Sequence, residues 1–321
     1  MTGLVVDHWA ADIKRLRLPM PAFDGVNSFI LGVSDRQTVV DTGMPGGETA
    51  SLWQSALRDR LLDNVDTVLC THGHIDHVGQ AGLLTRETGA ALVMSGDEYE
   101  DVFRLSQMSL AQRRELGEAF HGAGGFPLAG RAQPTDYSVL APFPEHGTLL
   151  RDGDVITLGG IAFEVLLGGG HSRAPICLLS RTRKILFAGD QLLIGSGPQV
   201  PVQPERPEDD VLGAYFHFLD RLDALPDDLV VFPGHGEPIR NFRQLVARIR
   251  DGHQQRLIRL LTTISGAMTC AEMAPLIFTR PPGRLSPRLP YLMRGMANYL
   301  VARSELQVRS DADVLKYQRK Q

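Results

Sequence analysis

The sequence contains little cysteine and no long apolar segment, and both absences narrow the class of protein. Its three cysteines, Cys70, Cys177 and Cys270, are an odd number, lie far apart and stand in apolar stretches. We therefore expect buried thiols rather than a disulfide framework, and a reducing cytoplasm as the compartment. No run of about 18 apolar residues occurs, so no membrane-spanning helix is expected. The first residues also lack the pattern of a signal peptide, and we expect none.

The chain also lacks internal repeats and low-complexity segments, so its 321 residues are expected to form one large domain or two smaller ones. Strand-like apolar runs alternate with helical patterns, which is typical of a layered α/β fold with helices on the sheet faces. The expected strands cover residues 28–33, 38–40, 65–70, 91–94, 154–158, 161–167, 176–179, 185–187 and 229–232. The expected helices cover residues 49–62, 77–88 and 208–225.

The densest group of metal-binding side chains lies in the sequence T-H-G-H-I-D-H at residues 71–77. It holds His72, His74, Asp76 and His77 within six residues. Four such groups rarely serve packing alone, because burying them unpaired is costly. Imidazole and carboxylate ligands at this density predict a transition-metal site, with zinc as the default and manganese or iron as alternatives.

The spacing of these residues indicates that they can serve two metals. His72 and His74 follow a predicted strand, and residues two apart in an extended segment point the same way. Asp76 and His77 stand at the start of a predicted helix and enter the same space from another angle. Three further candidates follow or border strand-like runs beside glycine, where a ligand can project from a turn. They are His171 in G-G-G-H-S, Asp190 in F-A-G-D and His235 in F-P-G-H-G.

Together with V-D-T-G at residues 40–43, these motifs resemble the metallo-β-lactamase superfamily over roughly residues 20–240, in the order of that family. The resemblance implies an αββα sandwich, in which two mixed sheets pack face to face with helices outside. It also implies two metal ions, with Asp41 orienting a ligand or a strand turn from behind. The implied ligands are His72, His74 and His171 for one ion, Asp76, His77 and His235 for the other, and Asp190 as the bridge between both.

This ligand set predicts the mechanism. Two divalent ions about 3.5–4 Å apart can hold a hydroxide that attacks an acyl carbonyl or a phosphorus centre, so no serine or cysteine nucleophile is needed. Asp76 and Asp190 are therefore the expected catalytic residues, and Asp76 is also a candidate proton shuttle. Ser172 and Arg173, next to His171, are either substrate contacts or merely exposed.

An insertion of residues 97–147 lies between two of the ligand motifs, so it should border the active site. It begins with a helical pattern over residues 97–120 and then becomes rich in glycine and proline. We predict a lid or pocket wall whose loss would change substrate preference and leave metal content intact; a plain surface insertion is the alternative. Its expected lining residues are Tyr99, Phe103, Met108 and Phe126.

Residues 1–240 are predicted to form the catalytic domain and residues 241–321 a small C-terminal domain. A helix is expected over residues 241–264, a short helix from the capping box at Thr269 to Phe278, and a helix over residues 289–303. Pro281 and Pro282 break the chain between these helices, and a hairpin is expected over residues 306–315. This order is winged-helix-like and resembles the extension of the branch that includes the lactamase-β-like endoribonuclease.

The charge of the chain is divided unevenly. From Arg240 onward there are 15 Lys and Arg against 5 Asp and Glu, a net charge of +10, whereas the remainder has 18 against 32, a net charge of −14. The basic tail could bind nucleic acid or the phosphates of a coenzyme A thioester. It could equally dock on the acidic catalytic body, either its own or that of a second copy in a homodimer.

Several branches of the superfamily fit this chain poorly. Class B1 β-lactamases place a cysteine where this chain has Asp190, nucleases with a β-CASP domain are much longer, and the flavodiiron branch has an appended flavodoxin domain. Three activities remain: a small-molecule thioester or ester hydrolase acting on acyl-CoA or acylglutathione, a lactonase, and an endoribonuclease on single-stranded RNA. The complete ligand set argues against a non-enzymatic module. We favour the first activity, because a lid suits an enclosed small-molecule pocket.

Overall fold

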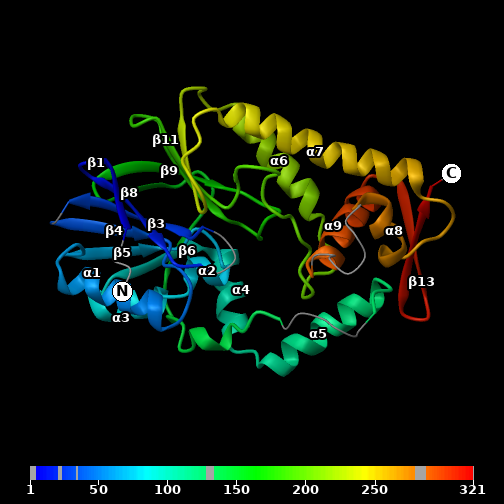
Figure 1. The fold of residues 1–321 in the computed structure, drawn as a ribbon, viewed down its shortest axis with the longest axis horizontal. Coiled ribbons are helices and arrows are strands. Elements are labelled where there is room, and N and C mark those ends of the chain that lie inside the picture. The colour runs from blue at the N-terminus through cyan, green and yellow to red at the C-terminus, as the bar shows by residue number, and fades with distance from the viewer. Residues whose placement is uncertain (1–4, 21–23, 34, 128–133, 279–286, 321) are drawn as a thin grey trace.

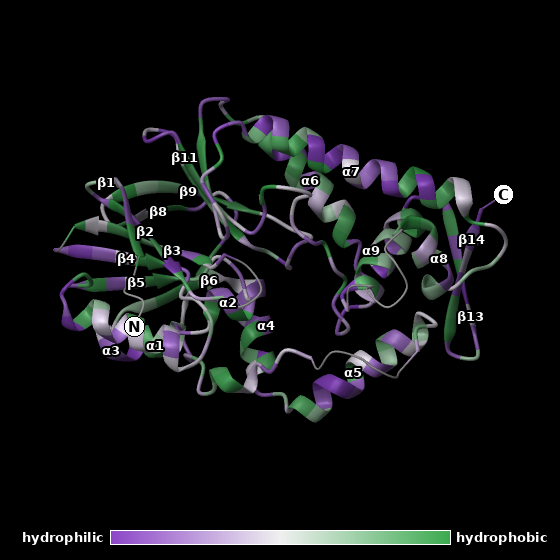
Figure 2. Cartoon of the chain, in the orientation of Figure 1, coloured by the Kyte–Doolittle hydropathy of each residue, from purple (hydrophilic) through white to green (hydrophobic). Residues whose placement is uncertain are grey.

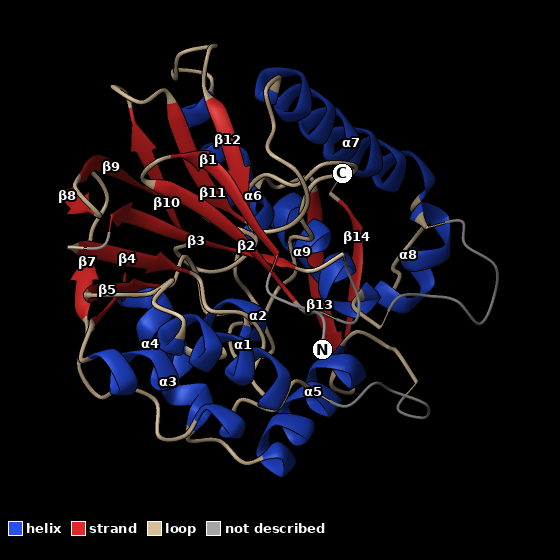
Figure 3. Ribbon diagram, turned by 60° about the vertical axis from the view of Figure 1, so that its left-hand side comes forward, coloured by secondary structure: helices blue, strands red, loops and turns tan. Residues whose placement is uncertain are grey.

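The computed structural model describes residues 5–20, 24–33, 35–127, 134–278 and 287–320. Two mixed β-sheets pack face to face, and helices cover the outer face of each (Figure 1). Figure 3 shows the same layers from another direction, with helices on either side of the strands. The αββα sandwich predicted from the sequence is therefore confirmed.

In the described residues the first sheet has seven strands, which follow one another across the sheet in chain order. The first four strands pair antiparallel, and the strands from the fourth to the seventh pair in parallel. The strands are β1 (Val5–Ala10), β2 (Ile13–Leu18), β3 (Val26–Val33), β4 (Arg36–Val40), β5 (Val65–Leu69), β6 (Ala91–Ser95) and β7 (Thr148–Leu150). We did not predict β1, β2 or β7, because the first two mix charged and apolar residues and the last has only three residues.

The second sheet, over the part of the chain that the structure describes, has five strands in the order β12-β11-β10-β9-β8. Its pairs are antiparallel except for β11 and β12, which are parallel. The strands are β8 (Val155–Leu158), β9 (Ile161–Leu167), β10 (Ile176–Ser180), β11 (Ile185–Gly189) and β12 (Val230–Pro233). Every residue of β10 and β11 is buried, because both faces of this sheet are covered, and this explains their continuous apolar runs.

Aromatic side chains fill the space between the two sheets. Phe29 of the first sheet contacts Phe187 of the second with ring centroids 4.8 Å apart, and Phe187 stacks on Phe232 at 5.0 Å. The outer faces are covered by α1 (Gly47–Arg58), α3 (Ala81–Thr88) and α4 (Gly96–Ser106) on one side, and by α6 (Val211–Leu222) and α7 (Phe242–Thr263) on the other. Figure 2 shows the apolar stripe of α7 beside its polar one.

Two predicted helices are each split in the structure. The helix expected over residues 77–88 consists of α2 (Ile75–Val78) and α3, because Thr42 donates both its N–H and its hydroxyl to the carbonyl of His77, each at 2.8 Å. The helix expected over residues 97–120 consists of α4 and α5 (Leu110–Ala123). A capping box of Ser109 and Gln112 starts α5, and the short turn η1 (Ser138–Leu140) follows it.

The tail has the predicted order of helices and hairpin. Its elements are α7, α8 (Cys270–Ile277), α9 (Leu289–Ala302), β13 (Leu306–Asp311) and β14 (Val314–Arg319), and the capping box of Thr269 and Glu272 is present. Pro281 and Pro282 lie outside the described residues. Buried side chains of the tail, including Met293 and Tyr317, share one apolar cluster with α6 and the second sheet. The tail is thus packed on the sandwich rather than tethered to it.

Charge complementarity accompanies this packing. Four arginines of the tail pair with carboxylates of residues 208–228, in α6 and its flanking segments. The pairs are Arg243 with Asp227, Arg250 with Asp220 and Asp223, Arg294 with Glu208, and Arg303 with Asp210. The charge distribution left several roles open for the basic tail. The structure shows one of them, in which the tail docks on the protein's own acidic body.

The cysteines agree with a further expectation. Cys70, Cys177 and Cys270 are buried free thiols. No helix in the described residues is long and apolar enough to cross a membrane.

His253 of α7 gives the stability of the fold a dependence on pH. Burial lowers its pKa from 6.5 to about 4, and its Nε2 has no hydrogen-bond partner among the described residues. The unfolded chain therefore binds a proton that the folded chain does not, and stability falls as the pH falls from about 6.5 towards 4. Between pH 7.5 and pH 5 this group should remove about 2 kcal/mol from the free energy of unfolding.

The variant His253→Gln should lose that part of the pH dependence, as measured by urea unfolding at the two pH values. The exposed His217 of α6 provides the control, and His217→Gln should leave the dependence as it is in the wild type. An equal change in the free energy of unfolding between the two pH values in wild type and His253→Gln would contradict the prediction.

Candidate metal centre

The seven predicted ligands meet at one end of the sandwich. Each follows or borders a strand, so that the sheets fix where the loops begin. They are His72 and His74 after β5, Asp76 and His77 in α2, His171 after β9, Asp190 after β11, and His235 after β12.

The ligands form two groups in space. Within each group, one candidate ligand atom per residue lies within 4.8 Å of all the others. In the second group, Asp76 Oδ2 lies 3.2 Å from His235 Nε2 and 3.6 Å from His77 Nε2. The first group is His72, His74, His171 and Asp190, and the second is Asp76, His77 and His235.

Asp190 lies between the two groups. Its Oδ2 is 3.5 Å from His171 Nε2 in the first group and 3.5 Å from His235 Nε2 in the second, and its Oδ1 is 3.5 Å from His77 Nε2. A single carboxylate therefore faces both groups.

Asp41 and Thr42 of the V-D-T-G motif contact His77 of the second group and fix its position. Asp41 is 1% exposed and its Oδ2 lies 2.8 Å from His77 Nδ1, which turns Nε2 of that ring towards the other ligands. Its Oδ1 accepts the backbone N–H of Thr71 at 2.7 Å. The Asp41 backbone has φ 59°, a left-handed conformation that turns this carboxylate inward at the end of β4.

Two of the other imidazoles, His171 and His235, are oriented by backbone carbonyls that the sequence did not reveal. His171 Nδ1 lies 2.9 Å from the carbonyl oxygen of Gln199, and His235 Nδ1 lies 2.9 Å from that of Gly25. The Asn27 amide donates to the carbonyls of Pro233 and Gly236, which flank His235. No sequence pattern marks these carbonyl contacts, since any residue type can provide them.

Burial keeps the first group of imidazoles uncharged. It lowers the pKa of His72 well below the usual value, lowers that of His171, and lowers that of His74 to about 3. A neutral imidazole has a lone pair to offer a cation, so these three side chains are in the protonation state that metal binding requires.

The second group has the opposite electrostatics. Burial would lower the pKa of His77, but Asp41, Asp190 and Asp76 outweigh it and raise that pKa well above the usual value. Burial likewise opposes protonation of His235, yet hydrogen bonds to Asp190 and Asp76 raise its pKa to about 9. Positive charge is thus strongly favoured here, and a divalent cation can take the place of these protons.

Buried atoms without partners complete the fit to a metal. His77 Nε2, His171 Nε2 and Asp190 Oδ1 are buried and have no hydrogen-bond partner among the described residues. Leaving such atoms unsatisfied is costly. Because these atoms belong to the two ligand groups, the cluster fits divalent cations.

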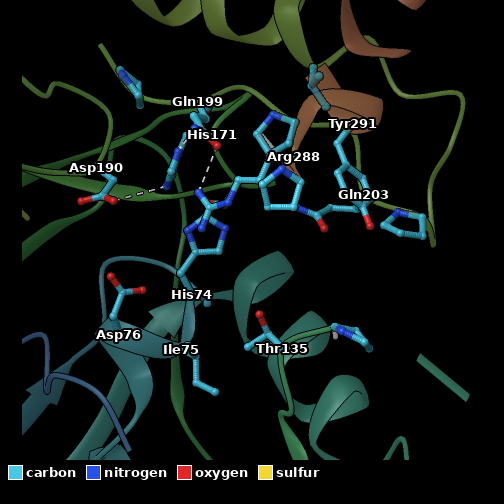
Figure 4. Close-up of a pocket in the computed structure, with 18 of the residues that line it drawn as sticks. His74, Ile75, Asp76, Thr135, His171, Asp190, Gln199, Gln203, Arg288 and Tyr291 are labelled. Atoms are coloured by element: carbon cyan, nitrogen blue, oxygen red, sulfur yellow. Dashed lines mark hydrogen bonds and ion pairs between the residues drawn. The ribbon is translucent and has the colours of Figure 1, made fainter. Parts of the chain in front are cut away.

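The ligands lie at one side of a large cavity, shown in Figure 4. Its volume is about 1760 Å³, which exceeds the 300–1,000 Å³ of an ordinary small-molecule pocket. Besides the metal ligands and their loops, its lining includes residues of the insertion, of the segment 193–211 and of the start of α9. The insertion thus forms a wall of the cavity, as the sequence predicted, and the tail contributes another.

The predicted substrate contacts divide into two sets. Ser172, Arg173 and Phe126 line the cavity. The Arg173 guanidinium also pairs with Glu100 at 2.8 Å and with Asp97 at 3.1 Å, so α4 balances its charge.

Tyr99, Phe103 and Met108 are not among the lining residues, and their prediction as lining residues was wrong. Tyr99 and Phe103 lie on the side of α4 that packs on the first sheet, and the Tyr99 hydroxyl donates to the carbonyl of Pro144 at 2.9 Å. Met108 contacts Arg104 within the turn after α4. The spacing of Tyr99, Val102 and Phe103 is that of an apolar helix face, and it could have revealed this packing.

The family follows from the sequence as well as from this geometry. A family model described as the metallo-beta-lactamase superfamily matches residues 21–235. The chain therefore belongs to the metallo-beta-lactamase superfamily, and it is a hydrolase of that superfamily with a cluster suited to divalent metals.

Two curated relatives resemble the chain over different lengths. The hydroxyacylglutathione hydrolase GloC of Haemophilus influenzae is 28% identical over 220 residues, which are 68% of this chain and 89% of that one. The acyl-coenzyme A thioesterase MBLAC2 of Bos taurus is 31% identical over 181 residues, which are 53% of this chain and 59% of that one.

Two solved structures match nearly the whole chain. A beta-lactamase domain protein from Burkholderia ambifaria superposes with a TM-score of 0.84 and 26% identity, over 98% of this chain and 93% of that one. A metallo-beta-lactamase family protein from Thermus thermophilus superposes with a TM-score of 0.79 and 24% identity, over 98% of this chain and 100% of that one. Both matches extend through the tail, so the tail belongs to the fold that these proteins share.

Proposed function

We propose that this protein is a dinuclear-metal-dependent hydrolase of a small-molecule thioester or ester, of the acyl-CoA or acylglutathione type. The observation that carries this proposal is Asp190, which faces both ligand groups at the side of a large cavity. The relatives named as a hydroxyacylglutathione hydrolase and an acyl-coenzyme A thioesterase support a thioester. Zinc is the proposed metal, with manganese or iron as alternatives, and the cytoplasm is the proposed compartment.

Two divalent cations in these groups would supply Lewis acidity, which activates water and polarises an acyl carbonyl. The protein's own residues then hold the ligands and move the proton. Asp41 and the Gln199 carbonyl fix the orientations of His77 and His171. Asp76 lines the cavity, and its neighbour His77 keeps it ionised by lowering its pKa against the effect of burial. Asp76 is therefore ionised, as a metal ligand must be, and we propose it also as the shuttle for the proton that an attacking water releases.

The basic tail gives an RNA substrate no specific support, because at least four of its arginines pair with the protein's own carboxylates. The comparisons support neither nucleic-acid binding nor a homodimer. An endoribonuclease and a lactonase are therefore kept as outcomes of the test below.

A substrate panel tests the proposal. Purified protein of known metal content is assayed with acyl-CoA thioesters, S-lactoylglutathione, a homoserine lactone and a fluorescent single-stranded RNA. We expect metal-dependent turnover of a thioester. Cleavage of the RNA alone, with the same metal dependence, would replace this proposal by the endoribonuclease, and turnover of the lactone alone would replace it by the lactonase.

Arg288 is the proposed contact for the anionic carrier of such a thioester. It lines the cavity at the start of α9, and its guanidinium donates to the side-chain oxygen of Gln199 at 3.1 Å. Figure 4 shows it extending from the tail towards Gln199 and His74. Both coenzyme A and glutathione carry anionic groups, which a guanidinium binds well.

We expect Arg288→Ala to raise KM about tenfold with little change in kcat, because a hydrogen bond to a charged group is worth about 1.5–3 kcal/mol. Steady-state kinetics on the preferred thioester measures both constants. The matched control is Arg309→Ala on the exposed hairpin, which should leave KM unchanged. An unchanged KM in Arg288→Ala would place the carrier elsewhere in the cavity.

A further inference from the structure

A buried carboxylate outside the ligand set joins two of the ligand loops. Glu98, in the first turn of α4, is only 3% exposed. Its Oε2 accepts the backbone N–H of Gly73 at 2.8 Å, and its Oε1 accepts that of Ala174 at 2.8 Å. Gly73 separates His72 from His74, and Ala174 is the third residue after His171. One side chain therefore connects the loops that carry three histidines of the first group.

Both backbone polar groups of Gly73 form hydrogen bonds with buried side chains. Its N–H donates to Glu98, and its carbonyl accepts the hydroxyl of the buried Tyr137 at 3.0 Å. A Cβ at this position would lie 2.6 Å from Val102 Cγ2 and 3.1 Å from Glu98 Oε2, so the loop lies against α4 without space for a side chain. This close approach explains why glycine stands between the two histidines.

Tyr137 is itself fixed by a second layer of contacts. The Arg113 guanidinium lies over its ring, 5.0 Å from the centroid, and pairs with Glu205 at 3.4 Å. Arg113 and Glu205 are both largely buried at 12% side-chain exposure. The contacts therefore run from α5, through the segment before η1, to the loop of His72 and His74.

An ordinary packing role does not explain Glu98. No cationic side chain in the described part of the chain forms an ion pair with it, and burial raises its pKa. A buried carboxylate is costly unless its oxygens are well satisfied, and here the donors come from two ligand loops and from no other backbone. An apolar residue would fill the same space without that cost.

We propose that Glu98 is a positioning residue that sets the distance between the loop of His72 and His74 and the loop of His171. The first ligand group is thereby formed before a metal binds, and α4 is part of the metal centre. This inference rests on the metal-binding part of the proposed function and not on its substrate. It reverses one expectation from the sequence, namely that the insertion can be lost without loss of metal.

The variant Glu98→Gln tests this role because it keeps the shape of the side chain. Its amide has one accepting oxygen, so one of the two N–H groups must face an NH₂ group instead. Loss of a residue that supports a ligand typically costs about 10–100-fold in metal affinity, and we expect a loss in that range for one of the two metals. Competition of metal-free protein with a chromophoric chelator for Zn²⁺ gives the dissociation constants.

Two further variants accompany it. Tyr137→Phe removes only the hydroxyl that donates to Gly73 and should weaken the same metal by a smaller factor. Glu100→Gln lies on the same helix with an exposed side chain and should leave both dissociation constants unchanged. The visible absorption of the Co²⁺-loaded protein reports ligand geometry, and it should change in Glu98→Gln but not in Glu100→Gln.

The outcomes separate this inference from the function that it rests on. Weakened metal binding in Glu98→Gln with a melting temperature of the metal-free protein close to wild type supports positioning. Metal dissociation constants of Glu98→Gln within twofold of those of the wild type overturn the positioning role, even if the protein hydrolyses a thioester. If Glu98→Gln fails to fold, Tyr137→Phe decides on the same criterion. A wild-type protein that binds only one ion refutes the dinuclear proposal and leaves Glu98 testable on that ion, whereas one that binds none refutes both.

Discussion

Asp190→Ala should abolish most hydrolysis and lower the bound metal from two ions to one or none. Its carboxylate lies 3.5 Å from ring nitrogens of His171 in one group and of His235 in the other, so its loss affects both. Loss of a residue that only supports a ligand typically lowers metal affinity or activity about 10–100-fold. Loss of a shared ligand should therefore lower kcat/KM by roughly 100-fold or more.

The measurements are kcat/KM on the preferred thioester and metal per chain by elemental analysis. Asp228→Ala is the matched control, because Asp228 is exposed and pairs only with Lys184 in the described structure. His235→Ala gives a second comparison, since it removes a ligand of the second group alone and should weaken mainly one ion. Two bound ions and full activity in Asp190→Ala would show that the site is assigned wrongly.

Gly234→Ala should be nearly as damaging, although it adds only a methyl group. The backbone of Gly234 is not in the left-handed region, so alanine can adopt it without strain. The new Cβ would, however, collide with Asp190 Oδ1 and lie 2.7 Å from His77 Cε1. Either Asp190 rotates away or β12 shifts, and each response separates the shared carboxylate from one ligand group.

We expect kcat/KM of Gly234→Ala to fall by roughly 100-fold, as for loss of an essential supporting residue, with a modest fall in melting temperature from overpacking. Gly252→Ala on α7 is the control, because a Cβ there has no heavy atom within 4 Å and should leave activity unchanged. Wild-type activity in Gly234→Ala would mean that the geometry between Asp190 and His77 has more freedom than the structure indicates.

The sequence predicts which residues gather at the candidate metal centre, because each lies in a short motif near a strand end. His72, His74, Asp76 and His77 are neighbours in the chain, and the other three ligands stand beside glycine after or next to apolar runs. Most strands of the two sheets are also predictable, because their buried faces require apolar residues. These properties are local, and a single stretch of sequence contains them.

The groups that hold the ligands in place are not predictable in the same way. In the sequence, Glu98 is simply an acidic residue in the first turn of a helix, where a negative charge interacts favourably with the helix dipole. Only the folded chain brings it to Gly73 and Ala174, which are 25 and 76 residues away in the sequence. The prediction for Tyr99 and Phe103 was wrong for a different reason, because their spacing with Val102 on α4 already indicates an apolar helix face that packs on a sheet.

The insertion consists of two parts that would respond differently to selection. Residues of α4 contact the ligand loops through Glu98, whereas α5 contributes Gly117, Glu118 and His121 to the cavity wall. A library for altered substrate range should therefore keep Glu98 and Arg113, whose contacts reach the ligand loops, and vary Gly117, Glu118 and His121. Relatives with the same chemistry and other substrates should then differ mostly at cavity-lining positions of α5 such as these three.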